Sequence, residues 1–222
     1  MPKTIDLDTD QNKEYYSRVF HFTECLSFLE KTGQKIYGSK FKTVEEDHPV
    51  IFKLFTYFFR DPENAEKLNI DLGKGILLMG PVGCGKTSIL NIMKYIRPPQ
   101  KQHIMISTRK ISYQFIKEGY AIIEKYSDSS FIYATDDWIP KTYCFDDLGV
   151  ENNLKYYGNE CNVMAEIVLS RYDLFISRNM LTHITTNLTS SEIENIYGIR
   201  VRSRLRQMCN LVSFGDSKDK RV

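Results

Sequence analysis

Beyond residue 74, short apolar runs alternate along the chain with longer segments whose apolar residues recur at helical spacing. Short runs indicate buried strands, and helical spacing indicates helices with one buried face. Strands and helices in alternation are typical of a parallel sheet covered by helices on both faces. The segment between 126 and 142 is predicted to be a loop. The predicted strands are 75–79, 103–107, 142–146, 181–186 and 211–214, and the predicted helices between them are 87–96, 108–126 and 160–177.

The N-terminal part of the chain carries a different pattern. Aromatic and aliphatic residues at helical spacing predict one helix over 13–31 and a second over 47–59. The second ends before Pro62, because proline disfavours the helical conformation in the residue before it. We therefore expect a small helical N-terminal extension at 1–70 and an α/β domain at 71–222. The extension either packs against the domain or offers exposed aromatic side chains to a protein partner.

A phosphate-binding motif lies between the first predicted strand and the helix that follows it. Residues 80–87 match the pattern G-x-x-x-x-G-K-[ST] at each of its fixed positions. The strand before the glycine-rich turn and the helix after it are the context that this motif requires, which argues against a chance glycine-rich turn. The candidate nucleotide-binding residues are Gly80, Pro81, Val82, Gly83, Cys84, Gly85, Lys86, Thr87 and Ser88.

Each part of this motif has a physical role in phosphate binding. Glycines let the backbone curl until successive N–H groups point at phosphate oxygens, and the helix N-terminus adds its dipole. Lys86 supplies a positive charge for the β- and γ-phosphates, which makes it a candidate catalytic residue as well. The hydroxyl of Thr87 is an oxygen ligand that suits Mg²⁺. Cys84 lies at the helix N-terminus and near Lys86, and both features favour a reactive thiolate.

Two acidic residues, Asp146 and Asp147, follow an apolar run in the third predicted strand. An apolar strand that ends in acids, downstream of a phosphate loop, resembles a Walker B element. In that element the first acid, Asp146, holds Mg²⁺ directly or through water. The second, Asp147, lies beside the γ-phosphate and polarises an attacking water. Solvated carboxylates at a strand end are the alternative, which the intact phosphate loop makes the weaker interpretation.

The fourth predicted strand ends in three polar residues, Thr185, Thr186 and Asn187. Active sites of parallel sheets gather at the carboxyl ends of the strands, so this polar tip is predicted to lie beside the two acids. Asn187 is a candidate for orienting the attacking water or sensing the γ-phosphate, with a helix cap or a turn as the alternative. His183, inside the same strand, is interpreted as a core histidine.

The C-terminal part of the chain is basic. Residues 197–222 carry seven basic and two acidic residues, a net charge of +5 in a chain whose formal net charge is +2. Four arginines before the fifth predicted strand have three interpretations. They contact a phosphate in a neighbouring subunit, or contact DNA phosphates, or form a solvated helix face. These residues are Arg200, Arg202, Arg204 and Arg206.

Composition excludes several classes of protein. The apolar runs stay far below the roughly 20 residues that span a bilayer, and the first residues lack the apolar segment of a signal peptide. The five cysteines lie far apart without a C-x-x-C pair, which argues against structural zinc and against disulfides. We therefore expect a soluble cytoplasmic protein without a membrane partner.

Residues 70–221 resemble the AAA+ ATPases of the DnaC-type helicase loaders and the IstB-type transposition helpers. The resemblance implies a three-layer P-loop NTPase fold of the AAA+ (ASCE) type with a five-stranded parallel sheet. The sequence stops shortly after the fifth predicted strand, so we expect no C-terminal helical lid. The motifs that carry the resemblance are Gly-Pro-Val-Gly-Cys-Gly-Lys-Thr at 80–87, Phe-Asp-Asp-Leu-Gly at 145–149, Arg171-Tyr172, Thr-Thr-Asn-Leu at 185–188 and Tyr-Gly-Ile-Arg-Val-Arg-Ser-Arg-Leu at 197–205.

The resemblance also implies roles for single residues. Asp146 is implied to be the metal-binding acid and Asp147 the catalytic acid. Asn187 is implied to be the first sensor, and Arg204 an arginine finger that acts on the nucleotide of a neighbouring subunit. The implied cofactors are ATP and Mg²⁺, and the implied assembly is a homo-oligomer that forms on nucleotide or DNA.

The function that fits these features best is ATP binding and hydrolysis coupled to replicative helicase loading, with single-stranded DNA and a replicative helicase as partners. A transposition helper that acts with a transposase is one alternative. A nucleotide-switched binding module with little turnover is another. A small-molecule kinase is disfavoured, because the paired carboxylates at 146–147 suit the activation of water better than the phosphorylation of an acceptor.

Overall fold

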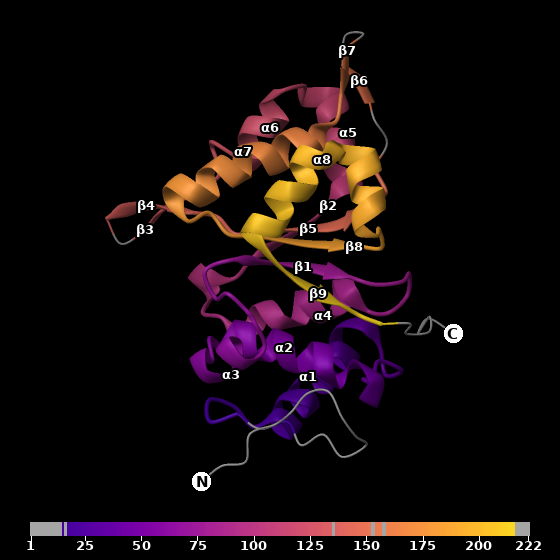
Figure 1. Cartoon of the computed structure of the whole chain (residues 1–222), viewed down its shortest axis with the longest axis vertical. Coiled ribbons are helices and arrows are strands. Elements are labelled where there is room, and N and C mark those ends of the chain that lie inside the picture. Colours follow the sequence, from indigo (N-terminus) through magenta and orange to yellow (C-terminus); the bar gives the residue numbers. More distant parts are fainter. Residues whose placement is uncertain (1–14, 16, 135, 152–153, 157–158, 216–222) are drawn as a thin grey trace.

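The computed structural model describes residues 15, 17–134, 136–151, 154–156 and 159–215. A central sheet lies between two groups of helices, so the described chain has three layers (Figure 1). The strands pair in the order β2-β5-β8-β1-β9, and each pair is parallel, which confirms the predicted five-stranded parallel sheet. These strands are β1 (Gly75–Met79), β2 (Ile104–Ser107), β5 (Tyr143–Leu148), β8 (Thr182–Thr186) and β9 (Cys209–Ser213).

Helices cover both faces of this sheet (Figure 1). One face carries α1 (Phe22–Tyr37), α2 (His48–Phe59), α3 (Pro62–Lys67) and α4 (Lys86–Met93). The other face carries α5 (Thr108–Glu118), α6 (Ala121–Tyr126), α7 (Val163–Arg178) and α8 (Ser190–Met208). Short 3-10 turns lie at Glu45–Asp47, Lys94–Ile96 and Pro99–Lys101. None of the helices in the described part of the chain combines the length and the apolar character needed to cross a bilayer.

Two antiparallel hairpins project from the layers (Figure 1). The first consists of β3 (Phe131–Ala134) and β4 (Asp137–Pro140), and the second of β6 (Leu154–Tyr156) and β7 (Asn159–Cys161). The prediction of a loop between 126 and 142 is wrong, because the first hairpin lies in this segment. Aromatic and β-branched residues favour paired strands here, and the chain reverses next to Asp136, whose φ is 61°.

Two glycines interrupt the helices of the second face. The helix predicted over 108–126 is two helices, α5 and α6, because Gly119 lies between them with a φ of 61°. Gly198 bends α8 with a φ of 86° and a ψ of 159°. Gly119 combines its positive φ with a ψ of −144°. Positive φ combined with a ψ this far from the left-handed helical region is readily adopted only by glycine, so each glycine sets the point at which a helix stops or turns.

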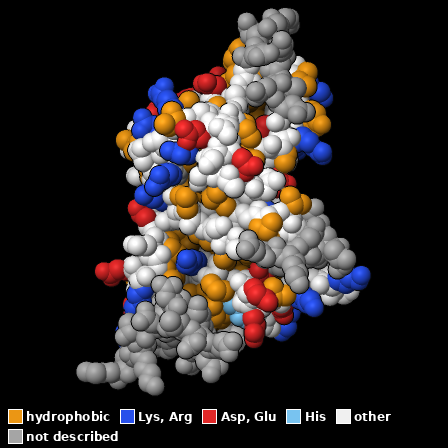
Figure 2. Space-filling view, turned by 45° about the vertical axis from the view of Figure 1, so that its right-hand side comes forward, with side chains coloured by type: hydrophobic (Ala, Val, Ile, Leu, Met, Phe, Trp, Pro, Cys, Tyr) orange, Lys and Arg blue, Asp and Glu red, His pale blue; other side chains and the backbone are white. Residues whose placement is uncertain are grey.

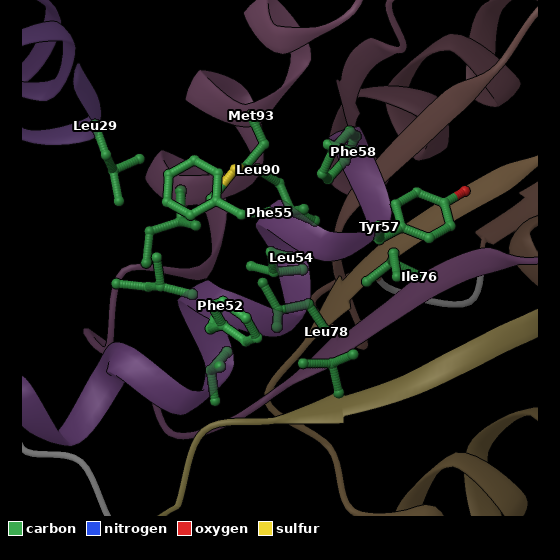
Figure 3. Packing of buried hydrophobic residues seen from close by; sticks show 14 of the residues in the cluster. Leu29, Phe52, Leu54, Phe55, Tyr57, Phe58, Ile76, Leu78, Leu90 and Met93 are labelled. Atoms are coloured by element: carbon green, nitrogen blue, oxygen red, sulfur yellow. The ribbon is translucent and has the colours of Figure 1, made fainter. Parts of the chain in front are cut away.

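The N-terminal helices share a hydrophobic core with one face of the sheet (Figure 3). Figure 3 shows Leu54 and Phe55 of α2 close to Leu78 of β1 and Leu90 of α4. These four side chains are fully buried. Burying such side chains contributes roughly 1.5–3 kcal/mol each, so the packing of the extension against the α/β layers stabilises both. The division of the chain at residue 70 stays a prediction.

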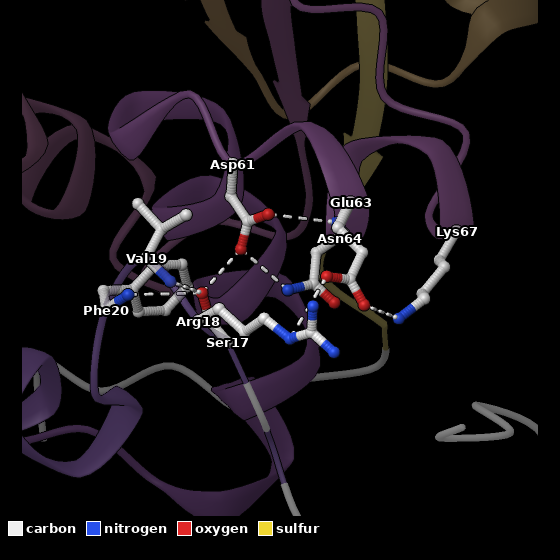
Figure 4. Close-up of polar contacts among 8 residues, drawn as sticks. All are labelled: Ser17, Arg18, Val19, Phe20, Asp61, Glu63, Asn64 and Lys67. Atoms are coloured by element: carbon white, nitrogen blue, oxygen red, sulfur yellow. Dashed lines mark hydrogen bonds and ion pairs between the residues drawn. The ribbon is translucent and has the colours of Figure 1, made fainter. Parts of the chain in front are cut away.

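Asp61 connects the segment before α1 with the start of α3 (Figure 4). Its carboxylate accepts hydrogen bonds from the backbone N–H of Asn64 at 3.2 Å and from the side-chain amide of Asn64 at 2.7 Å. Asp61 is therefore the N-cap of α3. The same carboxylate accepts a hydrogen bond of 2.5 Å from the hydroxyl of Ser17. One buried acid thus holds two segments 44 positions apart.

The opposite face of the sheet contains a buried arginine, Arg171 of α7. Its guanidinium donates to the hydroxyl of Thr182 at 2.7 Å and to the backbone carbonyls of Tyr126, Lys141 and Leu181 at 2.8, 3.1 and 2.8 Å. Burial lowers the pKa of this arginine to about 9. Because Tyr126 and Lys141 flank the first hairpin, one side chain anchors both of its ends to the sheet.

Candidate nucleotide-binding site

The phosphate loop joins β1 to α4, and its glycines adopt conformations that require glycine. Gly80, Gly83 and Gly85 have φ values of 153°, 84° and 95°. A Cβ added at Gly80 would lie 2.8 Å from the Cβ of Phe214, closer than real Cβ atoms approach. Gly85 immediately precedes the first turn of α4. A curled loop before a helix N-terminus can direct several backbone N–H groups at one anion.

Lys86 folds back over the loop from which it extends. Its ammonium group donates hydrogen bonds of 2.8 Å to the backbone carbonyls of Gly80 and Pro81. The side chain is only 6% exposed. These carbonyls hold a desolvated positive charge within the phosphate loop, where the oxygens of a bound phosphate can replace them.

The side chain of Cys84 points into the protein. It is fully buried, and its sulfur lies 3.8 Å from the Lys86 Nζ. A Cβ at Gly80 would lie 3.1 Å from the same sulfur, so the thiol fills the space beneath the loop. The thiol that was expected to be reactive is therefore a buried core side chain, and only the backbone of Cys84 remains a candidate phosphate contact.

The first acid of β5 meets the first turn of α4. The Thr87 hydroxyl donates a hydrogen bond of 2.8 Å to Oδ1 of Asp146, and the Thr185 hydroxyl donates one of 2.7 Å to the same oxygen. Burial raises the pKa of Asp146 and the nearby Asp147 adds to this, whereas the two hydroxyls and Lys86 oppose it. A cation beside Asp146 would favour its ionised form.

Thr87 and Asp146 are the residues that fit a magnesium ion. Mg²⁺ prefers oxygen ligands and is usually held by one or two protein groups together with substrate phosphates. The two side-chain oxygens lie 2.8 Å apart at the end of the phosphate loop, which satisfies this description. The described residues contain no group of three histidine, cysteine or acidic side chains that could hold an ion by themselves.

The second acid, Asp147, lies at an irregular point of the sheet. Its φ is 58°, in the left-handed region. The register of β5 on β8 shifts between Phe145 and Leu148, so Asp147 leaves the regular ladder. Its backbone N–H donates to the hydroxyl of Thr185 at 2.8 Å, and its carbonyl accepts from the hydroxyl of Thr108 at 2.8 Å. Both sides of the residue are therefore bonded to threonine side chains.

Asn187 directly follows β8 and is exposed. The hydroxyls that contact the acidic strand come from the residues before it. Thr185 bonds to both acids, as described above, and Thr186 donates a hydrogen bond of 2.6 Å to the carbonyl of Leu148. The structure thus places the predicted polar tip of β8 beside the acids, and its buried contacts are made by the two threonines.

Arg204 lies in the second half of α8 and stacks on its own chain. Its guanidinium carbon is 4.2 Å from the ring centre of Tyr172, and its Nη1 donates to the Tyr172 hydroxyl at 3.2 Å. The partners that the structure gives it are on α7 and α8, not in the phosphate loop. Arg202 pairs with Glu194 at 2.6 Å. The contacts recorded for Arg204 therefore do not join it to the other predicted site residues.

Two residues of this site, Thr108 and Thr185, were missed as functional candidates. Thr185 begins the polar run Thr185-Thr186-Asn187, in which the predicted functional role belongs to Asn187, its last residue. Thr108 was visible only as the start of a helix. His183 is a core histidine, as predicted: it is buried and its Nδ1 accepts a hydrogen bond of 3.0 Å from the Ile76 backbone N–H.

Comparison with known sequences points to a nucleotide-binding domain. A family model described as ABC transporter matches residues 64–218, more than half of the chain. ABC transporter B family member 1 of Arabidopsis thaliana is 28% identical over 99 residues, which cover 43% of this chain and 6% of that protein. The chain therefore spans only a small part of the length of this relative.

Comparison with solved structures points to the same fold. The crystal structure of the DnaC helicase loader has a TM-score of 0.54 and 16% identity, over 78% of this chain and 92% of that one. A candidate primosome component from Streptococcus pyogenes serotype M3 has a TM-score of 0.54 and 15% identity, over 83% of this chain and 88% of that one. At these identities the likeness shows the fold, which agrees with the fold expected from the resemblance.

Proposed function

The chain belongs to the P-loop NTPase family whose model is described as ABC transporter, and from this premise we propose that it is a magnesium-dependent ATPase whose hydrolysis is coupled to a DNA transaction. The observation that carries the proposal is the 2.8 Å hydrogen bond between Thr87 and Asp146. It joins the phosphate loop to the acidic strand end, which are the two halves of a P-loop active site.

Each residue of the site has a proposed role in ATP binding or hydrolysis. Lys86 exchanges its two carbonyl partners for oxygens of the β- and γ-phosphates. Thr87 and Asp146 would hold Mg²⁺, which neutralises charge on those oxygens when bound. Asp147 accepts a proton from the attacking water as a general base. Asn187, exposed beyond β8, is free of buried contacts that would prevent it from orienting that water.

Completion of the site requires a second subunit. Arg204 makes a cation–π contact and a hydrogen bond with Tyr172 in its own chain. A partly buried contact of this kind is worth about 0.5–2 kcal/mol, so it can be exchanged for the charge of a phosphate on a neighbouring subunit. We therefore include a homo-oligomer, formed on nucleotide or DNA, in the proposed function.

The outer face of α5 supports a nucleic-acid partner. Tyr113 is 57% exposed and Ile116, three positions along α5, is half exposed. Tyr120, also half exposed, follows α5 immediately after Gly119. Aromatic rings that alternate with cations are typical of single-strand binding surfaces, because bases stack on the rings while cations contact the phosphates. The exposed cations on this face are Arg109, Lys110 and Lys117.

Among DNA transactions, we propose replicative helicase loading. The support is the likeness of the fold to a structure described as a helicase loader, together with the motifs at 145–149 and 197–205. A transposition helper uses the same chemistry with a different protein partner. Capture of a replicative helicase, but not a transposase, by the ATP-loaded protein would favour loading over transposition.

Phosphate release with and without single-stranded DNA tests the coupled ATPase. We expect release to increase with DNA, and Tyr113→Ala combined with Tyr120→Ala to remove the increase. Tyr133→Ala is the matched control, because Tyr133 is 59% exposed on β3 and should leave the increase intact. An equal rate of phosphate release with and without DNA would favour an ATPase that drives another partner, such as the membrane-spanning part of a transporter. Absence of turnover would favour a nucleotide-switched binding module.

A further inference from the structure

Asp147 has an unusual backbone for a residue in a strand. A φ of 58° is rare for residues with a Cβ, although aspartate and asparagine tolerate it better than most. It occurs where the pairing of β5 with β8 is interrupted. The peptide groups on both sides of Asp147 therefore need hydrogen-bond partners outside the ladder.

Two threonine hydroxyls supply these partners from different elements. Thr185 of β8 accepts from the Asp147 N–H at 2.8 Å, and Thr108, the first residue of α5, donates to the Asp147 carbonyl at 2.8 Å. The same carbonyl also accepts a longer hydrogen bond of 3.3 Å from the Val150 backbone N–H. Both threonines are fully buried. A buried, short and doubly bonded arrangement keeps the left-handed conformation from relaxing to the extended conformation of a regular strand.

Thr185 also makes a hydrogen bond to the other acid of the site, Asp146. A hydroxyl has one proton to donate and lone pairs to accept with. The Thr185 hydroxyl accepts from the Asp147 N–H and donates to Oδ1 of Asp146 at 2.7 Å. One side chain thus fixes the position of one acid relative to the other. The Thr108 hydroxyl donates to the backbone of Asp147 and not to Asp146, so its effect can be separated from any effect on Asp146.

We propose that Thr108 and Thr185 are positioning residues that clamp the backbone of Asp147 and thereby aim its carboxylate at the attacking water. This inference rests on the proposed role of Asp147 as the general base. The clamp is chemically specific, because it needs a donor at position 108 and an acceptor at position 185. Serine retains both groups, whereas valine has nearly the same shape as threonine and lacks them.

The clamped conformation can be tested without any nucleotide. Asp147→Gly and Asp147→Ala both remove the carboxylate. They differ in the cost of the left-handed conformation, which destabilises the alanine variant, and in the flexibility of the unfolded chain, which destabilises the glycine variant. At a residue with an ordinary strand backbone the alanine variant would therefore be the more stable of the two. We expect the glycine variant to melt at the same temperature as the alanine variant or above it. An alanine variant that melts clearly above the glycine variant would overturn the inference, because the left-handed backbone would then not be held in solution.

The effect on catalysis is tested with Thr108→Val and Thr108→Ser. We expect the valine variant to lower kcat by about tenfold or more with an unchanged Kd for ATP, and the serine variant to restore kcat. A melting curve of each variant shows that it is folded. Thr185→Val should lower kcat in the same way and also raise the Mg²⁺ concentration that turnover requires, since Oδ1 of Asp146 then loses one of its two hydroxyl donors.

The variant Asp147→Asn, measured in the same assays, distinguishes a failure of the clamp from a failure of the proposed general base. If it loses turnover while Thr108→Val keeps the wild-type kcat, the clamp is wrong and the role of Asp147 stands. If Asp147→Asn turns over like the wild type, the proposed base is wrong, and the inference that positions it is overturned with it.

Discussion

The hydroxyl of Thr87 donates a hydrogen bond of 2.8 Å to Oδ1 of Asp146, although 59 positions separate the two residues in the chain. Thr87 lies in the first turn of α4 and Asp146 near the carboxyl end of β5. Parallel strands bring their carboxyl ends to one edge of the sheet, which is why these two elements meet. The contact places two oxygen ligands at the end of the phosphate loop, so it should control the metal dependence of the protein.

Asp146→Asn should raise the Mg²⁺ concentration needed for tight ATP binding by about tenfold or more, because an amide oxygen lacks the charge that attracts a divalent cation. Titration of ATP affinity against Mg²⁺ measures the shift. Glu118→Gln is the matched control, since it also removes one negative charge but does so at a surface ion pair with Lys125. An equal Mg²⁺ requirement in both variants would contradict the role of Asp146.

Lys86→Ala should weaken ATP binding, because it removes the ammonium group that the loop carbonyls of Gly80 and Pro81 now hold. A charged hydrogen bond to phosphate contributes roughly 1.5–3 kcal/mol, which corresponds to an increase in Kd of about 10- to 150-fold. Equilibrium binding of a fluorescent ATP analogue measures it. Lys94→Ala, at the end of α4, serves as the control and should bind like the wild type.

The buried histidines predict that the protein loses stability in acid. Burial lowers the pKa of His103 to about 4, with a smaller contribution from Lys94. Burial also lowers the pKa of His183, and the neighbouring His103 and Arg171 add to this. The unfolded chain therefore binds protons below about pH 6.5, where the folded protein does not. The contribution to stability is complete above that pH and is lost as the pH falls toward 4.

Urea unfolding at several pH values between 7 and 4 measures this loss. The shift of His103 alone corresponds to roughly 3 kcal/mol over the range. His103→Leu should flatten the dependence, whereas His21→Leu, which removes an exposed histidine, should leave it unchanged. If the two variants have the same pH dependence as the wild type, the acid sensitivity comes from other groups.

Arg171→Met should destabilise the fold by about 3 kcal/mol or more, because two buried and two partly buried acceptors lose their donor. Arg178→Met is the control on the same helix. Arg178 is exposed, makes a long hydrogen bond of 3.4 Å to the Trp138 carbonyl and lies 5.3 Å from the ring centre of Phe131, so its loss should change stability by about 1 kcal/mol or less. Similar free energies of unfolding for the two variants would contradict the anchoring role of Arg171.

The sheet could be predicted because its strands are short, because the inner strands β1, β5 and β8 are largely buried, and because the phosphate loop orders the first strand and helix. The residue at which the first helix starts could not be predicted from the sequence. Val19 and Phe20 fit the helical spacing, but the Ser17 hydroxyl accepts hydrogen bonds from their backbone N–H groups and donates to Asp61. A tertiary contact therefore turns the chain here, and the helix begins only at Phe22.

In the candidate site, too, some residues could be predicted from the sequence and others could not. Lys86, Thr87 and Asp146 follow from motifs whose chemistry depends on residue type and spacing. The roles of Thr108 and Thr185 depend on the register shift in β5 and on the left-handed backbone of Asp147. Neither feature leaves a periodic signal in the sequence, so both threonines read as ordinary helix and strand residues until the structure is considered.

Arg204→Ala should bind ATP almost normally and hydrolyse it poorly. Its partners within one chain are Tyr172 and Gln207, so its removal leaves the phosphate loop intact. If it reaches the phosphate of a neighbouring subunit, it stabilises transition-state charge there, an effect worth about 10³–10⁵ in rate in other phosphoryl-transfer systems. Wild-type activity per subunit should then increase with protein concentration, because each site is completed only by a neighbour.

Mixing two inactive variants provides the sharpest test of this arrangement. In a mixture of Arg204→Ala with Asp147→Asn, some interfaces combine an intact Asp147 from one subunit with an intact Arg204 from the other, so part of the activity should return. Arg206→Ala is the matched control, because Arg206 is an exposed arginine on the same helix; alone it should keep the wild-type activity. Absence of rescue, together with activity that does not depend on concentration, would instead make Arg204 a DNA-phosphate contact or a surface residue held by Tyr172.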